Sequence, residues 1–298
     1  MKVKSSALLI EAGKPTMKPT SVTIAAWLVT ITLTFATPIA HSAQPPISKT
    51  FSVGIVPQFD SRKIHKIWRP LLNELETITG HKFKLEGAPT IQEFENELNA
   101  GRFDFAYINP YQASLTNNKQ GYIPLVRDIE KHLQGILVVR RGKEIKRVEE
   151  LANQIVSFPA PNALGATLMI RADMQDLFDT QVKPQYVKTH SSVYLNVALG
   201  LTKAGGGVQK TLNQQSVEIR DALRVLYKTR HVVPHPLSAH PRVNSGIIAQ
   251  VTEGLLALNE TVQGQQMLKK IPINKIGPAT IEDYAPLGRM GLERFYEN

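Results

Sequence analysis

The spacing of apolar residues from Thr50 onward predicts strands and helices in alternation. Phe51 to Val56 is a short, mostly apolar run of the kind that forms a buried strand. Between Lys63 and Thr79 apolar residues recur every three or four positions, which predicts an amphipathic helix, and Gly80 is the residue type that ends one. Strands at 82–85, 103–108 and 123–126 alternate with helices at 91–100 and 111–118. This order, with short connections, predicts a parallel sheet covered by helices on both faces.

A second set of strand and helix signals indicates a second lobe. The charged and polar segment 127–134 is interpreted as a crossing out of the first sheet, and 231–240 as the return crossing. Between them, strands are predicted at 135–140, 155–158, 185–188, 203–208 and 223–227, and helices at 148–151, 163–178, 193–199 and 209–221. Helical signals at 243–258, 261–269 and 281–296 complete the chain. We therefore expect two α/β lobes, with residues 44–134 and 232–298 in lobe I and residues 135–231 in lobe II.

Residues 1–43 have the order of segments found in a secretory signal peptide. Basic residues flank Met17, a candidate start, and the stretch 22–40 is apolar or hydroxylic throughout. Small residues from Ala40 to Ala43 then precede Gln44 and two prolines, so cleavage is predicted at the end of that small-residue stretch. An uncleaved anchor is the alternative, because about 19 such residues can span a bilayer. We expect an exported, periplasmic protein that is not embedded in the membrane once it is processed.

The composition is that of an ordinary globular protein and excludes several kinds of chemistry. The 298 residues are 42% hydrophobic and 20% charged, which is enough for two lobes with separate cores. The formal net charge of +10 falls to +7 after residue 43 and is spread along the chain, which fits an anionic ligand but not nucleic acid. The sequence has no cysteine, so a lipid-attached cysteine, disulfides, thiolate catalysis and cysteine-type zinc sites are excluded.

The stretch IVSFPAPNALGATLMIR, residues 155–171, predicts a strand, a turn with two prolines and the start of a helix. Asn162 has the residue type of an N-cap and is expected to cap this helix. The backbone N–H groups of Ala163, Leu164 and Gly165, together with the positive end of the helix dipole, would then favour an anion. An ordinary strand-to-helix connection without a ligand is the alternative that these residues leave open.

Further candidates for ligand contact follow other predicted strands, because ligands of open α/β sheets bind beyond the carboxyl ends of the strands. Tyr107 and Asn109 lie at the end of the strand 103–108, and Tyr107 offers a phenolic hydroxyl; a core aromatic is the alternative. His190 precedes a helix beside two hydroxyl residues and can donate an imidazole N–H, or it is a structural or exposed loop histidine. Lys210 follows a glycine-rich strand and can face an anion, although the ending of a Walker phosphate loop is missing.

No catalytic or metal-binding motif is evident in the sequence. The HExxH, GxSxG, Ser-x-x-Lys, dinucleotide-glycine and calcium-loop patterns are all missing. His231, His235 and His240 lie close in sequence, but prolines intervene and no carboxylate stands among them, so we expect neither a metal nor a cofactor. A secreted enzyme that uses His190 and Tyr107 is an alternative, but neither residue has a recognisable nucleophile–base partner nearby in the sequence. A binding protein is therefore favoured.

Short motifs occur in a fixed order over nearly the whole chain after residue 43. They are Val53 to Pro57, Trp68 to Leu71 with Leu75, Glu76 and Gly80, Gly101 to Tyr107, Asn109-Pro110, Phe158 to Asn162, His190 ahead of Val197 to Gly200, and Asp283-Tyr284. In this order they resemble the phosphate/phosphite/phosphonate-type substrate-binding proteins of ABC transporters, which are periplasmic binding proteins of the type II fold. The resemblance implies an α/β fold of two Rossmann-like lobes with a hinge. It also implies a protein that is not an enzyme and that closes on a small anionic solute for an ABC permease.

The resemblance also implies which residues bind the solute, and the chain departs from the family at one of these places. In the family, the turn that matches Pro161 onward supplies serine and threonine hydroxyls and backbone N–H groups, and residues that match Tyr107 and His190 contribute. Here Ala163, Leu164 and Gly165 stand where the hydroxyls belong. Each lost bond to a charged group is worth about 1.5–3 kcal/mol, so we expect a different anion, such as a carboxylate or a partly apolar anion, or a loss of tight binding. A module that presents itself to a membrane sensor protein is the alternative to a transport role.

Overall fold

The strands of the protein form two separate sheets. The computed structural model describes residues 48–142, 145–271 and 273–297, which all belong to one compact unit, so the predicted signal peptide lies outside the described residues. The strands are β1 (Thr50–Ile55), β2 (Lys82–Glu86), β3 (Phe105–Tyr107), β4 (Ile123–Asp128), β5 (Leu133–Arg140), β6 (Ile155–Phe158), β7 (Lys183–Tyr186), β8 (Ala204–Val208), β9 (Leu223–Val232), β10 (Leu237–Ala239) and β11 (Ile276–Pro278). We call the elements around the six-stranded sheet the first lobe and those around the five-stranded sheet the second lobe.

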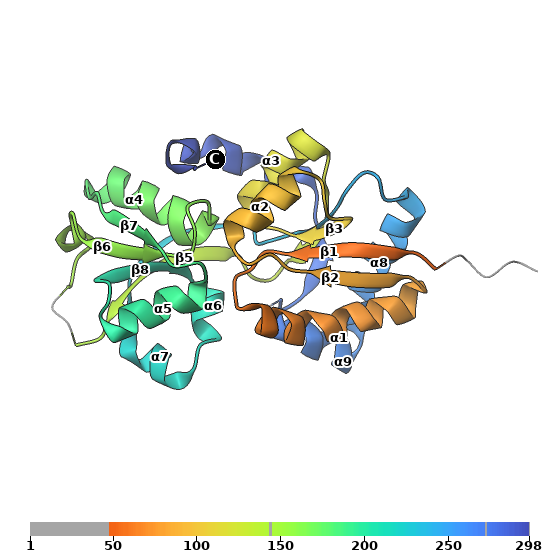
Figure 1. Cartoon of the computed structure of the whole chain (residues 1–298), viewed down its shortest axis with the longest axis horizontal. Helices are drawn as coiled ribbons and strands as arrows, with labels where there is room; N and C mark the ends of the chain where they lie inside the picture. The colour runs from red at the N-terminus through yellow and green to blue at the C-terminus, as the bar shows by residue number, and fades with distance from the viewer. Residues whose placement is uncertain (1–47, 143–144, 272, 298) are drawn as a thin grey trace, which may run out of the picture. The chain divides into compact units, whose positions relative to one another are not determined.

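Helices cover both sheets. The α-helices are α1 (Ser61–Thr79), α2 (Ile91–Asn99), α3 (Pro110–Gln120), α4 (Met169–Phe178), α5 (His190–Leu199), α6 (Gln209–Asn213), α7 (Val217–Ala222), α8 (Ser245–Ala257) and α9 (Val262–Lys270). Shorter helical turns are η1 (Val148–Leu151), the π-helix η2 (Leu164–Leu168), η3 (Leu258–Glu260), η4 (Ile281–Asp283), η5 (Ala285–Arg289) and η6 (Leu292–Phe295). In the first lobe, α1 and α9 lie on one face of the sheet and α2 and α3 on the other; in the second, α4 lies opposite α5 and α7 (Figure 1). Among the described residues, no helix is long and apolar enough to cross a membrane.

Each sheet is parallel in part and antiparallel in part. The first has the order β11-β4-β10-β3-β1-β2, with β1 parallel to both β2 and β3 and with β10 antiparallel to β3 and β4. The second has the order β7-β6-β8-β5-β9, with β6 parallel to β7 and β8 and with β5 antiparallel to β8 and β9. The chain passes between the sheets at 129–132 and again at 233–236. Two such crossings are the usual basis of a hinge between lobes.

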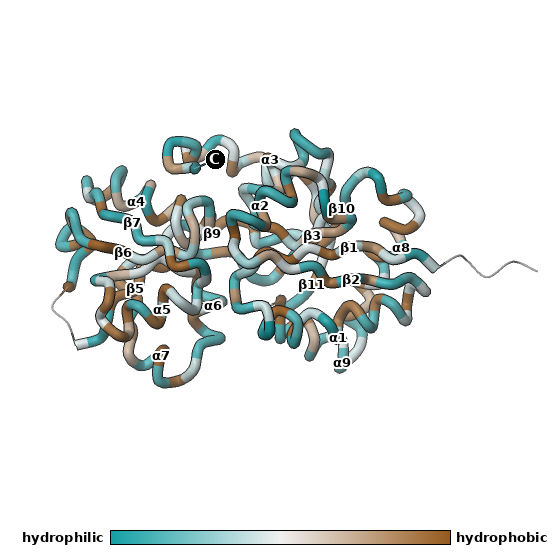
Figure 2. Tube along the Cα trace, in the orientation of Figure 1, coloured by the Kyte–Doolittle hydropathy of each residue, from teal (hydrophilic) through white to brown (hydrophobic). Residues whose placement is uncertain are grey.

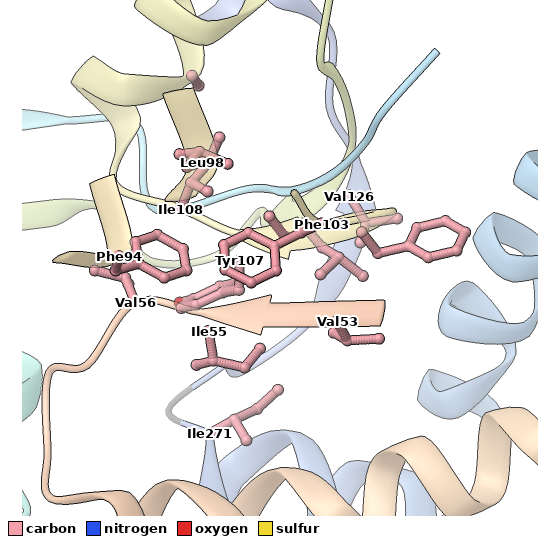
Figure 3. Packing of buried hydrophobic residues seen from close by; sticks show 14 of the residues in the cluster. Val53, Ile55, Val56, Phe94, Leu98, Phe103, Tyr107, Ile108, Val126 and Ile271 are labelled. Atoms are coloured by element: carbon pink, nitrogen blue, oxygen red, sulfur yellow. The ribbon is translucent and has the colours of Figure 1, made fainter. Parts of the chain in front are cut away.

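Local sequence explains how the first lobe assembles. The side chain of Asp60 accepts the N–H of Lys63 and caps α1, and Gly80 ends the helix with a φ of 71° that favours glycine. The alternation of apolar and polar residues along α1, visible in Figure 2, buries one stripe of the helix against the sheet. On β1, Ile55 points toward Ile271, while aromatic side chains from the neighbouring elements fill the other side (Figure 3). These residues belong to one apolar cluster that continues into the second lobe.

Glycines in β8 and β5 let the π-helix η2, which follows β6, lie close to the second sheet. A Cβ atom added at Gly206 would lie 2.0 Å from the carbonyl oxygen of Ala166, and one added at Gly135 of β5 would lie 2.0 Å from that of Gly165. Side chains at these two positions would therefore push the η2 backbone away. The glycines are required by this close contact and not by a phosphate loop.

The structure departs from several sequence-based expectations. Strands β10 and β11 were not predicted, since each has only three residues and both pair with β4, far away in sequence. The helix predicted at 209–221 is two helices, α6 and α7, and the helix predicted at 281–296 is three 3₁₀ turns. The N-cap expected at Asn162 is also wrong: η2 begins after Ala163, and no side chain caps it.

Candidate functional site

A small cavity lies where the two lobes meet, beyond the carboxyl ends of β1, β3 and β6. Its polar side chains are Gln58, Asn109, His190 and His235, and the remaining lining residues are Val56, Ile91, Leu133, Ala163, Leu164, Gly165, Ala166 and Val208. Its volume is about 20 Å³, which holds about one water molecule. This position is where open α/β sheets bind their ligands, so we call it the first cavity and treat it as the candidate site.

A second cavity of about 20 Å³ adjoins the first. It is lined by Gln58, Tyr107, Leu133, Val208, Lys210, Thr211, Pro234 and His235, and four of these residues also line the first cavity. The two cavities are therefore neighbouring spaces around the side chains of Gln58 and His235. Seven of the eight residues that the sequence predicts to contact the ligand line one or the other of these cavities. The exception is Asn162.

Backbone groups form one wall of the first cavity. Ala163, Leu164 and Gly165 line it at the start of η2, which continues directly into α4. The N–H groups of a first helical turn have no acceptor within the helix, so they can bind a ligand oxygen. The nearest hydroxyl in this turn is that of Thr167, and it donates to the carbonyl oxygen of Ala160 at 2.7 Å. The side chains of this wall thus add apolar surface and no hydrogen-bond donor.

His190 is a buried, neutral histidine at the wall of the first cavity. It is the first residue of α5, a helix capped by the Thr189 side chain, which accepts the N–H of Ser192. Its Nδ1 lies 3.3 Å from Oγ1 of Thr211. The ring is 3% exposed, and burial lowers the pKa of His190 to about 4. At neutral pH the imidazole is uncharged and can donate one hydrogen bond or accept one.

His235 lines both cavities, and the sequence-based prediction missed it as a ligand residue. Its Nε2 lies 3.1 Å from Nε2 of Gln58, and its ring stacks on that of Tyr107 at 5.4 Å between centroids. Burial, followed by the charge of Lys210 and, at acidic pH, that of protonated His190, lowers the pKa of His235 to about 3. Its place depends on β10, because Leu237 pairs with Tyr107 and so brings the preceding residues to the carboxyl end of β3. Because that strand was not predicted, the sequence placed His235 only in the segment 231–240, the predicted return crossing between the lobes.

Gln58 was also missed, although a signal for it existed. It lies in the loop directly after β1, where a parallel sheet presents ligand-binding groups. Its side chain carries both a donor and an acceptor and meets His235. The strand before this loop was predicted, but no property of glutamine singled Gln58 out from its neighbours.

Tyr107 faces the second cavity and lies in an aromatic stack. Its ring lies 4.9 Å from that of Trp68 and stacks on His235. Burial, and then the negative charge of Asp128, raises the pKa of Tyr107 well above its usual range. The phenol therefore stays protonated, and its hydroxyl can donate to an acceptor that enters the second cavity.

Lys210 is already engaged by a carboxylate across the two lobes. Its Nζ lies 3.0 Å from Oδ2 of Asp128, a carboxylate that also accepts the backbone N–H groups of Glu130, Lys131 and Asn274. Burial alone would raise the pKa of Asp128, but Lys210 and these N–H groups outweigh it and lower that pKa. Burial lowers the pKa of Lys210. The pair adds no net charge to the second cavity, so Lys210 does not supply the free cation that an anion site would use.

Asn109 and Asn162 connect the lobes to each other. Oδ1 of Asn109 accepts the N–H groups of Tyr111 and Gln112 and caps α3, while its Nδ2 donates to the carbonyl oxygen of Asn162 at 3.0 Å. Asn109 therefore lines the first cavity with an amide whose oxygen and nitrogen are both in use. Asn162 lines neither cavity, and its side chain is bonded to Glu95 and Glu297.

The three histidines considered as a metal site do not form one. Among the residues that the structure describes, no cluster of three or more His, Asp or Glu side chains is placed to hold a metal ion. His231 stacks on His132 at 5.9 Å, and His240 accepts the N–H of Arg242 through Nδ1. His235 alone of the three lines the candidate site.

Two α/β lobes, each with a mixed sheet, and a cavity at the strand ends between them define a periplasmic binding protein of type II architecture. More narrowly, the chain belongs to the family of periplasmic substrate-binding proteins of phosphonate ABC transporters, whose sequence model matches residues 53–284. Membership of this family supports a solute-binding role. No curated protein matches the chain by sequence.

Solved structures agree with this architecture. The chain is similar to a binding protein component of an ABC phosphonate transporter from Pseudomonas aeruginosa, with 15% identity and a TM-score of 0.74 over 83% of this chain and 86% of that one. It is equally similar to PhnD1 from Prochlorococcus marinus in complex with methylphosphonate, with 15% identity and a TM-score of 0.74 over 82% and 98% of the two chains. A Xanthomonas citri protein bound to chloride follows, with 14% identity and a TM-score of 0.66 over 83% and 98%. At these identities the likeness shows the fold.

Proposed function

We propose that this chain is an exported binding protein whose lobes close on a small anion at the first cavity and deliver it to an ABC permease. One observation carries the proposal: His190 of the second lobe and Gln58 of the first line the same cavity as the start of η2. A site divided between two lobes is completed when the lobes close, which is how hinged binding proteins retain a solute.

The charges around the two cavities favour a singly charged anion over a dianion. His190 and His235 are neutral at pH 7, and Lys210 is neutralised by Asp128. Among the described residues that line the two cavities, no unpaired cation compensates a dianion that leaves water, and such a transfer is costly in a buried site. A monoanion with an apolar part meets two imidazoles, backbone N–H groups and the apolar side chains of Ile91 and Leu133. A short-chain carboxylate and a singly protonated phosphonate both have this character.

A panel titration by calorimetry tests the ligand. Phosphate, phosphite, methylphosphonate, sulfate and short-chain carboxylates are titrated into the purified protein at pH 6 and pH 8. We expect at least one monoanion to bind. The His190→Ala variant should bind it at least about ten-fold more weakly, because it loses one hydrogen bond to a charged group. His65→Ala, which changes an exposed histidine on α1, is the matched control and should bind as the wild type does. If no anion of the panel binds, the solute-carrier role is wrong.

Delivery to a permease is tested in cells. Deleting the gene should abolish uptake of the anion found in the panel, and the wild-type chain, but not His190→Ala, should restore it. Uptake that is unchanged by the deletion would contradict transport and favour a sensory role. Export itself is checked by sequencing the N-terminus of the protein in the periplasm: a first residue near Gln44 agrees with cleavage, and a retained leader indicates an anchor.

A further inference from the structure

Asn162 is the point at which both lobes and the C-terminal segment meet. Its Nδ2 donates to Oε2 of Glu95 at 3.0 Å and to the backbone oxygen of Glu297 at 2.6 Å, and its Oδ1 accepts the N–H of Glu297 at 2.9 Å. Its own backbone oxygen accepts Nδ2 of Asn109. Glu95 and Asn109 belong to α2 and the start of α3 in the first lobe, whereas Asn162 follows β6 in the second. Asn162 is 1% exposed, so these bonds are shielded from water.

The C-terminal segment, residues 292–297, is bonded to both lobes. On the first lobe, Nε2 of Gln112 donates to the Tyr296 hydroxyl at 2.6 Å, and the Tyr296 ring lies 5.8 Å from that of Tyr111. On the second, the Glu297 carboxylate accepts the Tyr186 hydroxyl at 2.7 Å. The last described residues, dark blue in Figure 1, lie near α3 and α4, in agreement with these contacts.

Charged groups add to the contacts with the second lobe. Arg171 of α4 lies 3.7 Å from the Glu297 carboxylate, and its guanidinium group lies over the Phe295 ring at 5.0 Å. Arg294 pairs with Asp176, also on α4. The segment thus reaches from α3 to α4 and crosses the boundary between the lobes at Asn162.

Glu95 makes this junction sensitive to protonation. Its side chain is buried, and within the described residues neither its Oε1 nor Oε1 of Gln112 has a hydrogen-bond partner. A proton on Glu95 converts its carboxylate from an acceptor-only group into one that can also donate. Burial raises the pKa of Glu95 to about 7, against the opposing effect of the hydrogen bond from Asn162. The other titratable or charged groups at the junction are Tyr296, the Glu297 carboxylate and Arg171.

We propose that Asn162 is a positioning residue of the ligand site, and that residues 292–297 form a C-terminal clasp that holds it in place while the lobes are closed. Asn162 directly precedes Ala163, which lines the first cavity, so displacement of Asn162 displaces the start of η2. This part of the inference rests on the proposed function. The clasp itself requires only the bonds between the lobes and the C-terminal segment.

The distance between the lobes tests the clasp without any solute. Because the chain has no cysteine, Lys119→Cys on α3 and Lys183→Cys on β7, both exposed, provide two unique sites for spin labels. Pulsed electron–electron double resonance then gives the distribution of distances between the two labels in the wild type, Asn162→Ala and Glu297→Pro. Glu297→Pro removes the N–H that the Asn162 side chain accepts. Glu297→Pro removes one buried hydrogen bond and should raise the open fraction about ten-fold. Asn162→Ala removes three and should raise it by at least that much, and the double variant should add little to Asn162→Ala.

Two further variants separate positioning from general destabilisation. Asn162→Asp places a second carboxylate next to that of Glu95 and should open the lobes more at pH 8 than at pH 6. Adding Glu95→Gln reverses donor and acceptor in that bond and should recover part of the closed fraction. Glu293→Ala, in the same segment but outside the Asn162 contacts, is the control and should leave the distances unchanged.

Hydrogen exchange on the wild-type protein provides a second measurement should a variant fail to fold. The Glu297 amide should be protected at pH 6, and its protection, corrected for intrinsic exchange, should fall several-fold at pH 8. Unchanged distances in both single variants, or an unprotected Glu297 amide, would overturn the clasp. Distances that respond as expected in a protein that binds no anion of the panel would support the clasp and overturn the proposed function.

Discussion

Replacing Glu95 by Gln should stabilise the protein more as the pH rises. Glu95 is 2% exposed, and its one bond to the second lobe comes from the Asn162 amide. The glutamine oxygen keeps that bond, and a neutral NH₂ group replaces Oε1 of Glu95, which has no hydrogen-bond partner within the described residues. The variant removes a carboxylate that burial otherwise forces to stay protonated or to ionise at a cost.

The magnitude follows from the two pKa values of this carboxyl group. The ordinary value of 4.5 applies to the unfolded chain, and burial raises it to about 7 in the folded protein. At 1.36 kcal/mol per pH unit, the difference is worth about 3 kcal/mol in the free energy of unfolding. Because the folded pKa is raised, the folded state binds more protons between pH 4.5 and pH 7. This stabilisation is complete below pH 4.5 and is lost as the pH rises through 7.

Chemical denaturation measures the effect directly. The free energies of unfolding of the wild type and Glu95→Gln are compared at pH 4.5, 6 and 8 by circular dichroism in urea. The advantage of the variant over the wild type should grow by about 3 kcal/mol from pH 4.5 to pH 8. Glu253→Gln, at an exposed position on α8, should show no such growth. A difference for Glu95→Gln that does not change with pH would refute the reasoning.

Two other predictions concern packing in the second lobe and the ion pair between the lobes. Gly206→Ala would place a Cβ 2.0 Å from the carbonyl oxygen of Ala166, and should lower the free energy of unfolding by about 1–3 kcal/mol in thermal or chemical unfolding. Gly288→Ala, whose Cβ would have nothing within 4 Å, is the control and should not lower it. Equal effects of the two substitutions would contradict the close contact. Lys210→Met leaves Asp128 buried without its ion-pair partner and should cost about 3 kcal/mol, and the double variant with Asp128→Asn should recover part of that loss. A double variant less stable than Lys210→Met would contradict this account of the pair.

The two-lobed fold was predictable because its signals are local. The helical spacing in α1 and the run of apolar residues in β1 each fall within one segment of sequence, and short motifs in a fixed order supplied the architecture. The strands β10 and β11 could not be found in this way, because each has three residues and is defined by pairing with β4. The placement of His235 beside Tyr107 depends on such a pairing and was therefore missed.

Asn162 shows why a residue type alone does not fix a role. Asparagine before a helical run is the expected N-cap, and this local preference is worth only about 1 kcal/mol. In the structure the side chain instead makes three hydrogen bonds, to Glu95 and to the backbone of Glu297, residues 67 and 135 positions away. Several buried bonds outweigh one cap, but partners so distant in sequence are visible only once the chain has folded.

The small size of the first cavity also governs the rates of solute exchange. A space of about 20 Å³ is smaller than a carboxylate or phosphonate, and the Lys210–Asp128 pair joins the lobes beside it. Entry and exit therefore wait for an opening event whose frequency is a property of the protein alone. In a rapid-mixing experiment the observed association rate would rise with solute concentration only up to a plateau equal to the opening rate. Solute bound here would leave no faster than the lobes separate, which makes residence time the quantity that these contacts between the lobes control.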